Sequence, residues 1–437
     1  MHHSFDTITI VVRCENLRQK SADTFNDWWI PMSRPISYDS LITQRRRIIQ
    51  DQIADKSELV GYIYPHTPIE LFLAHDFTPT LLWAEPALTG AYEASLQTFC
   101  CAYSRNLFSQ RAKQQLPSLK AIVFPGGTCD SLQNLGDVWR ARFPDDSVLR
   151  LTYPVVNDDA ALTYLAEELR DLSNHLEVIL GSRFSMKKYQ QAAALVAEFR
   201  AAAQFISVAR ILQPSIFPFL EYTRLIRQFL TAPTAQSLQK IEEVATQMQD
   251  ELRKNQLLPI AEALRYGLLT GHIPDQINLQ SKGEPRIMIM GGMVDPVGIA
   301  VHFENAKSSA NLEEVEIAFD LLSFTFRTIF TKAPNLHGDP FFEMAQSILS
   351  APAEPTQEGL RARLGFLDQV FDKLYITGLI LCEQSFCDPD QFEVPDTLKL
   401  AEKKKLFTVR VPLDPEFSDR ARLEGRLQSF LETLTAR

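Results

Sequence analysis

The sequence lacks several motifs by which common enzyme classes are recognised. It contains no G-x-x-x-x-G-K-[ST], so the chain has no phosphate loop of its own. Its eight histidines show no H-E-x-x-H spacing, the zinc-binding pattern of many metalloproteases. Gly291 and Gly292 follow an apolar run without forming the G-x-G-x-x-G of a dinucleotide site, and a tight strand-to-helix turn is expected there.

Basic clusters and long apolar runs are also scarce. Acidic residues number 54 against 44 basic ones, and without clustered Lys and Arg nucleic acid is not an expected partner. The most apolar region runs from Ala192 to Leu220, and charged residues interrupt it at Glu198, Arg200 and Arg210, so no membrane span is expected. The first residues show no basic segment followed by an apolar core, so no secretory signal is expected and the predicted location is cytoplasmic.

Cysteine is scarce as well, with 6 in 437 residues. Few cysteines in a long chain without a signal argue against a disulfide framework, so reduced thiols, metal ligands or both are expected. The chain is 45% hydrophobic and 22% charged, as in an ordinary globular protein, and its length predicts two or three domains.

Short apolar runs alternate with helical patterns, which is typical of parallel βαβ units. Buried parallel strands form continuous apolar runs, and most of the runs have that form. Eight strands are predicted, at Leu59–Tyr64, Thr80–Trp83, Ala121–Phe124, Leu149–Tyr153, Arg286–Met290, Glu314–Ala318, Ile376–Leu381 and Leu406–Val411. The predicted fold class is therefore α/β, with two parallel-sheet domains.

A long helical stretch separates the two sheet regions. Asp158 can cap a helix whose leucines recur at helical spacing, and Gly181 can end it. Helical pattern continues from Met186 to Leu230 and from Ala235 to Leu269, which indicates a helical insert or lid.

These patterns predict four parts of the chain and two surface loops. The parts are an N-terminal helical extension over 1–55, a first α/β domain over 56–160, the insert over 161–283 and a second α/β domain over 284–437. The proline-rich segments 333–339 and 351–357 are expected to be surface loops.

Three cysteines are candidates for a shared site. Cys129 and Cys387 each come just after a predicted strand, and ligands of open parallel sheets bind beyond the carboxyl ends of strands. The two thiols are therefore expected at that edge, one in each domain. Cys101 is expected to begin or border a helix, and chemistry alone leaves open whether it or Cys100 faces the site.

The setting of these thiols suits an anionic metal cluster. Gly126 and Gly127 let backbone amides approach closely, and Asp130 or Ser131 is expected to cap the following helix. Soft thiolates select iron–sulfur clusters, zinc or copper, and the wide sequence spacing differs from the paired spacing of zinc fingers. The alternative is that each cysteine only packs, as free cysteine usually does.

A carboxylate and an imidazole after the first strand could transfer a proton. His66 and Glu70 flank Pro68 in that loop, and such a pair can act as general acid and base. The alternative is that the pair caps a helix or faces solvent.

At these segments the sequence resembles the 2-hydroxyacyl-CoA dehydratase and benzoyl-CoA reductase superfamily, roughly from Val60 to Glu432. The resemblance is carried by short motifs in a shared order. They are Gly61–Tyr64 with Thr67–Glu70, Cys101–Arg105, Phe124–Pro125 with Thr128–Ser131, Tyr164–Asn174 with Leu180–Ser182, Asp320–Ser323 with Arg327, Phe386–Pro389, and Arg426 with Ser429–Glu432.

The resemblance implies two flavodoxin-like (Rossmann-like) domains and a [4Fe-4S] cluster held by Cys101, Cys129 and Cys387. It selects Cys101 over Cys100. It implies radical dehydration of a 2-hydroxyacyl-CoA thioester, with the electron supplied by a separate ATP-hydrolysing activator. The expected partners are an acyl-CoA substrate, that activator, and a related second subunit or a second copy of the chain.

Two further interpretations compete with a dehydratase subunit. The first is a reductase subunit of the benzoyl-CoA reductase type or of the group that forms homodimers around a double-cubane [8Fe-9S] cluster. The second is a non-catalytic partner subunit that provides an interface or relays electrons. The sequence does not name the acyl group.

Overall fold

The computed structural model describes residues 9–12, 58–86, 88, 90–281 and 284–436, and confirms the α/β class. The first sheet is made of short, largely buried strands paired in parallel in the order β3-β2-β4-β5. Its strands are β2 (Leu59–Tyr62), β3 (Thr78–Leu81), β4 (Ala121–Gly126) and β5 (Val148–Thr152). Its helices are α3 (Ile69–Ala74), α4 (Ala102–Ala112) and α5 (Asp130–Arg142).

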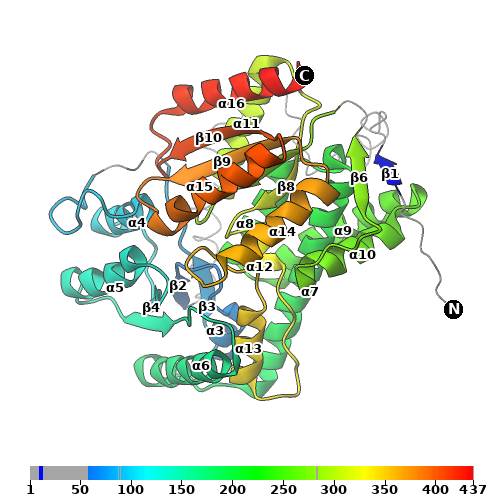
Figure 1. Ribbon diagram of the computed structural model, residues 1–437. Helices are drawn as coiled ribbons and strands as arrows, with labels where there is room; N and C mark the ends of the chain where they lie inside the picture. Colours follow the sequence, from blue (N-terminus) through cyan, green and yellow to red (C-terminus); the bar gives the residue numbers. More distant parts are fainter. Residues whose placement is uncertain (1–8, 13–57, 87, 89, 282–283, 437) are drawn as a thin grey trace.

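The second sheet is also parallel, in the order β10-β9-β7-β8. Its strands are β7 (Ile287–Met290), β8 (Ile317–Leu321), β9 (Gly378–Gln384) and β10 (Phe407–Leu413). Its helices are α11 (Pro296–Ala310), α12 (Phe326–Ile329), α13 (Pro340–Leu349), α14 (Leu360–Lys373), α15 (Asp388–Lys403) and α16 (Arg420–Thr435). Helices α11 and α16 pack together on one face of this sheet, and α14 and α15 lie over the other (Figure 1).

The two sheets share one topology. In each, the first strand along the chain (β2 or β7) lies between the second and the third. The strand order therefore reverses between β2 and β4 in one sheet and between β7 and β9 in the other. Loops at the carboxyl ends of strands beside such a reversal form the ligand site of open α/β sheets. The loops after β2, β4, β7 and β9 are thus the natural place for a site.

A helical segment follows β5, as predicted. It comprises α6 (Asp159–Leu180), α7 (Met186–Leu212), the short 3-10 helix η1 (Pro214–Ile216), α8 (Phe219–Thr231), α9 (Ala235–Lys254) and α10 (Leu258–Thr270). The side chain of Asp158 accepts from the Ala161 amide, and Gly181 ends α6 with φ 67°, so both expected caps are confirmed. The run from Met186 to Leu230 is divided into two α-helices where Pro214 and Pro218 interrupt it, as expected.

Helix α7 corrects the expectation that no segment is apolar enough to span a membrane. By length and composition α7 passes that test, with a mean hydropathy of 1.4 over its best 18-residue window, of which 67% is buried in the protein. It packs against α3, α9, α10 and α12. Arg210 of α7 is charged and buried. Its guanidinium is satisfied there because it donates to the carbonyls of Phe217 and Ile317. Here α7 is the central core helix.

Most predicted strands are confirmed with shifted ends. The largest shift is that of β8, which begins at Ile317 rather than Glu314. A two-stranded sheet was missed: β1 (Thr9–Val12) pairs in parallel with β6 (Asn278–Ser281). Apart from β1, the predicted helical extension over 1–55 lies outside the described residues.

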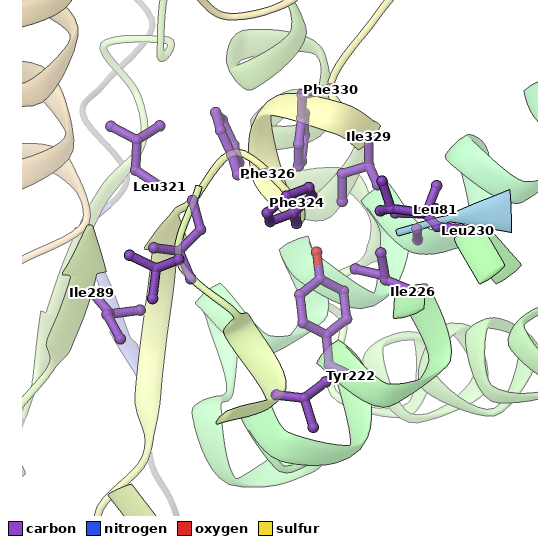
Figure 2. Close-up of a cluster of buried hydrophobic side chains, with 14 of the residues drawn as sticks. Leu81, Tyr222, Ile226, Leu230, Ile289, Leu321, Phe324, Phe326, Ile329 and Phe330 are labelled. Carbon is purple, nitrogen blue, oxygen red and sulfur yellow. The ribbon is translucent and has the colours of Figure 1, made fainter. Parts of the chain in front are cut away.

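One continuous core joins both sheets and the helical segment. Figure 2 shows side chains of this core converging from β3, α8, β7, β8 and α12, among them Leu81, Ile226, Ile289 and Phe326. Phe324, in the loop after β8, packs its ring 4.7 Å from the ring of Trp83 at the end of β3. Since these contacts cross between the two sheets, the loops at their carboxyl ends are held together.

Candidate functional site

Each of the three predicted thiols stands at the N-cap of a helix. Cys101 precedes α4, Cys129 precedes α5 and Cys387 precedes α15. Cys129 and Cys387 occupy equivalent positions, because each follows the third strand of its sheet. The expected cap for α5 was wrong: Cys129 itself holds the N-cap, which places Asp130 and Ser131 in the first turn.

The structure brings these loops of the two domains into contact. The amide of Ala102 donates to the carbonyl of Ser385 at 3.1 Å, and Nε2 of Gln384 donates to Sγ of Cys101 at 3.2 Å. Segments almost three hundred residues apart therefore meet beside Cys101. Cys101 is buried, while Cys129 and Cys387 are partly exposed, and all three thiols are free.

The electrostatics of the three thiols share one pattern. Burial raises the pKa of each, that of Cys129 to about 12, and the nearby Cys101 thiol raises the pKa of both Cys129 and Cys387 further. Helix N-terminal amides act in the opposite direction on all three pKa values. As free thiols the groups are protonated, and a cation or metal cluster would be needed to hold them as thiolates.

No group of three or more His, Cys, Asp or Glu side chains lies close enough to hold a single metal ion, within the part of the chain that the structure describes. The thiols are near enough to influence one another electrostatically but are not gathered around one point.

The glycine pair after β7 has a structural role in this site. As predicted, Gly291 and Gly292 lie in a tight turn between β7 and α11. The amide of Gly292 donates to Oδ2 of Asp390 at 2.9 Å, and Sγ of Cys387 donates to the same oxygen at 3.4 Å. A Cβ at position 292 would lie 2.6 Å from Oδ1 of Asp390, so glycine is required for this approach.

The segment 351–357, expected to be a surface loop, contributes a buried carboxylate instead. Oε2 of Glu354 accepts from Nη1 of Arg327 at 2.6 Å and from Oγ of Ser323 at 2.9 Å. Nε2 of His66 lies 3.1 Å from Oε1 of Glu354. Burial alone would raise the pKa of Glu354, but the charge of Arg327 and the bonds from His66 and Ser323 lower it to about 2.

A small pocket opens beside this network. It has room for about one water molecule and is lined by polar residues such as His66 and Thr128 and by apolar residues such as Leu349. Thr128 immediately precedes Cys129, so the pocket borders one of the candidate ligands. It offers a place for one water-sized polar group.

His66 and Glu70, the predicted proton-transfer pair, have different surroundings. His66 lines the pocket and contacts Glu354. Glu70 is buried in α3, and its Oε2 has no hydrogen-bond partner. Glu70 acts electrostatically on Arg200 and Tyr189 of α7.

Sequence reasoning missed Glu354, Gln384 and Asp390 as site residues. The one available signal was spacing, since Gln384 and Asp390 each lie three residues from Cys387. Glu354 gave no signal, because a single acid in a proline-rich loop usually faces solvent.

Two parallel-sheet domains of identical strand order, with a cysteine at the N-cap after the third strand of each, define a two-domain Rossmann-like protein with a thiol-lined site at its sheet edges. The chain belongs to the 2-hydroxyglutaryl-CoA dehydratase, D-component family, whose model matches residues 65–434.

Curated relatives are distant but match over most of their length. The chain is 23% identical over 387 residues to lactoyl-CoA dehydratase subunit beta of Anaerotignum propionicum, covering 86% of this chain and 91% of that protein. It is 21% identical to (R)-2-hydroxyglutaryl-CoA dehydratase, subunit beta, of Acidaminococcus fermentans, with 87% and 93% covered. It is 22% identical to a benzoyl-CoA reductase subunit of Thauera aromatica, with 78% and 82% covered. The predicted resemblance is confirmed.

Proposed function

We propose that the chain is the iron–sulfur subunit of a 2-hydroxyacyl-CoA dehydratase-type enzyme, in which Cys101, Cys129 and Cys387 hold a [4Fe-4S] cluster. The observation that carries the proposal is the placement of three free thiols at three helix N-caps, contributed by both domains. Membership of the dehydratase family supports the acyl-CoA substrate class.

The donor set fits a cluster better than a single ion. A cubane spreads its protein ligands over separate irons, so its thiolates stand farther apart than those of a mononuclear site. This agrees with thiols that influence one another without surrounding one point. Three helix N-termini, with amides aimed at the thiols, favour the negative charge of a thiolate-bound cluster.

When bound, such a cluster supplies a low-potential electron and an iron that can act as a Lewis acid toward a leaving hydroxyl. The residues of this chain would position and enclose it. His66, which lines the pocket beside Thr128, and the buried Glu70 are the candidates for proton transfer. The electron would come from a separate ATP-hydrolysing activator, as the family resemblance implies, and a chain without a phosphate loop of its own fits that division of labour.

The test is iron and sulfide content after anaerobic purification, with EPR of the dithionite-reduced protein. We expect about four irons and four sulfides per chain, lost in Cys129→Ala. Cys382→Ala is the control, because Cys382 is a buried free thiol inside β9 rather than at a helix N-cap. Absence of iron even after anaerobic reconstitution would contradict the proposal.

The similarity to the benzoyl-CoA reductase of Thauera aromatica favours a second candidate function, that of a reductase subunit. With a reducing activator present, turnover of an aromatic acyl-CoA and none of a 2-hydroxyacyl-CoA would select it. A near-doubled iron content would point to a double-cubane cluster.

Relatives of this chain are subunits, which supports a related partner or a second copy. Activity that appears only when a second related chain is added would identify this chain as the partner subunit. Size-exclusion chromatography with light scattering of the chain alone would separate a homodimer from a monomer awaiting its partner.

A further inference from the structure

Gln384 is the one side chain seen to reach from the second sheet onto a candidate sulfur of the first domain, among the described residues. It is the last residue of β9 and is 2% exposed. Its Nε2 donates to Sγ of Cys101 at 3.2 Å, and the carbonyl of the next residue, Ser385, accepts from the amide of Ala102. Side chain and main chain together fix this segment against Cys101.

The chemistry of this contact suits a ligated sulfur. A thiolate has no proton to donate, so it can only accept, and an amide is a neutral donor that keeps its N–H at every working pH. A hydrogen bond to a charged acceptor contributes about 1.5–3 kcal/mol, more than one between neutral groups. Because Gln384 is buried, water cannot replace the donor.

The three candidate sulfurs are therefore not equivalent. Cys101 is the most buried and receives an amide donor, whereas the polar side chain beside Cys387 is the carboxyl group of Asp390. A reduced cluster carries one more negative charge than an oxidised one. An N–H donor at a ligating sulfur stabilises the reduced form more, and so raises the reduction potential.

We propose that Gln384 is a positioning residue that holds the Cys101 thiolate and sets the reduction potential of the cluster. The proposal rests on the proposed function, since it requires that Cys101 ligate the cluster. It also assigns a role to the contact between domains: separation of the loops at 101 and 384 would lower the potential.

The test is a redox titration of the anaerobically purified full chain with titanium(III) citrate, followed by EPR. In Gln384→Met the side chain keeps its length and loses the N–H donor. We expect the potential to fall, so that at a fixed solution potential the ratio of reduced to oxidised cluster drops roughly tenfold, equivalent to about 59 mV for one electron. Gln384→Asn withdraws the donor and should shift the potential in the same direction by less.

Gln204→Leu is the matched control. Gln204 is also buried, and its Nε2 donates to a carbonyl, that of Ile329, rather than to a sulfur. The Gln204→Leu protein should have a lower free energy of unfolding but the same cluster reduction potential as the wild type. A cluster-bearing Gln384→Met protein with the wild-type potential would overturn the inference and leave the proposed function intact. A folded variant that fails to assemble the cluster, while the control assembles it, would support the positioning role. A wild-type chain without iron would overturn both proposals.

Discussion

His66 and Glu354 are 288 residues apart in the sequence, yet Nε2 of His66 lies 3.1 Å from Oε1 of Glu354, with side chains only 8% and 5% exposed. The contact joins the loop after β2 in the first domain to the segment between α13 and α14 in the second. Arg327 completes it with a direct ion pair to Glu354 at 2.6 Å. Burying a charge lowers the stability of the fold unless its partners are present, so the loss of any one member of this network is expected to destabilise the protein.

Glu354→Gln should destabilise the fold, because the Arg327 charge is left buried without its partner. We expect a loss of about 3–5 kcal/mol in the free energy of unfolding, measured by urea denaturation. Exposed Glu358 in the same segment provides the control, Glu358→Gln, which should cost little. Equal stability of the two variants would show that the network is solvated in solution.

The same carboxylate predicts acid sensitivity. The pKa of Glu354 is about 2 in the folded chain, below its ordinary value of 4.5, so its contribution to stability is present above pH 4.5 and is lost as pH falls toward 2. Its share is on the order of 3 kcal/mol. Unfolding midpoints between pH 5 and 3 should fall less steeply in Glu354→Gln than in the wild type, and parallel slopes would contradict the assignment.

Gly292→Ala should disturb the site through Asp390. The new Cβ would lie 2.8 Å from Cγ of Asp390, so the Asp390 side chain must move. We expect a loss of about 1–3 kcal/mol, the usual cost of overpacking, together with lower iron content. Gly425→Ala is the control: nothing lies within 4 Å of a Cβ there, inside α16, and stability should rise by about 0.5–1 kcal/mol.

A buried triad of Glu304 and Lys307 on α11 with Glu316 before β8 predicts the opposite pH dependence. Nζ of Lys307 lies 3.1 Å from Glu304 and 2.7 Å from Glu316, so two carboxylates share one ammonium. Burial and the charge of Glu316 raise the pKa of Glu304 to about 7. The unfolded chain releases this proton near 4.5, so stability should fall as pH rises from 4.5 through 7.

Glu304→Gln should remove that slope, and unfolding followed by circular dichroism from pH 5 to 8 would measure it. Exposed Glu402 in α15 gives the control, Glu402→Gln, which should retain the wild-type slope. A Glu304→Gln variant whose stability still falls with the wild-type slope would place the titration elsewhere.

If Glu70 and His66 transfer protons in the proposed reaction, Glu70→Gln and His66→Gln should each lower kcat by about a hundredfold or more, since positioned acid–base groups contribute 10²–10⁴-fold. Exposed Glu167 in α6 provides the control Glu167→Gln. A kinetically normal Glu70→Gln enzyme would restrict the role of Glu70 to the packing of α3 on α7.

The prediction of the fold succeeded where it depended on local pattern. Continuous apolar runs marked the strands of both sheets, and capping residues such as Asp158 and Gly181 marked the ends of α6. It failed where distant packing decided the outcome. α7 is as apolar as a membrane helix because its whole C-terminal part, residues 202–212, is buried in the core. β6 was missed because its partner β1 lies some 270 residues earlier.

By itself the sequence determined the α/β class and the family and indicated the candidate thiols at Cys101, Cys129 and Cys387, because strand periodicity, short ordered motifs and residue chemistry are local properties. Only the tertiary structure decided that all three thiols are helix N-caps, that Gln384 reaches the sulfur of Cys101, and that Glu354 lies buried against His66 and Arg327. The physical reason is that the free energy of a buried hydrogen bond or ion pair depends on groups hundreds of residues apart. No window of sequence contains both partners.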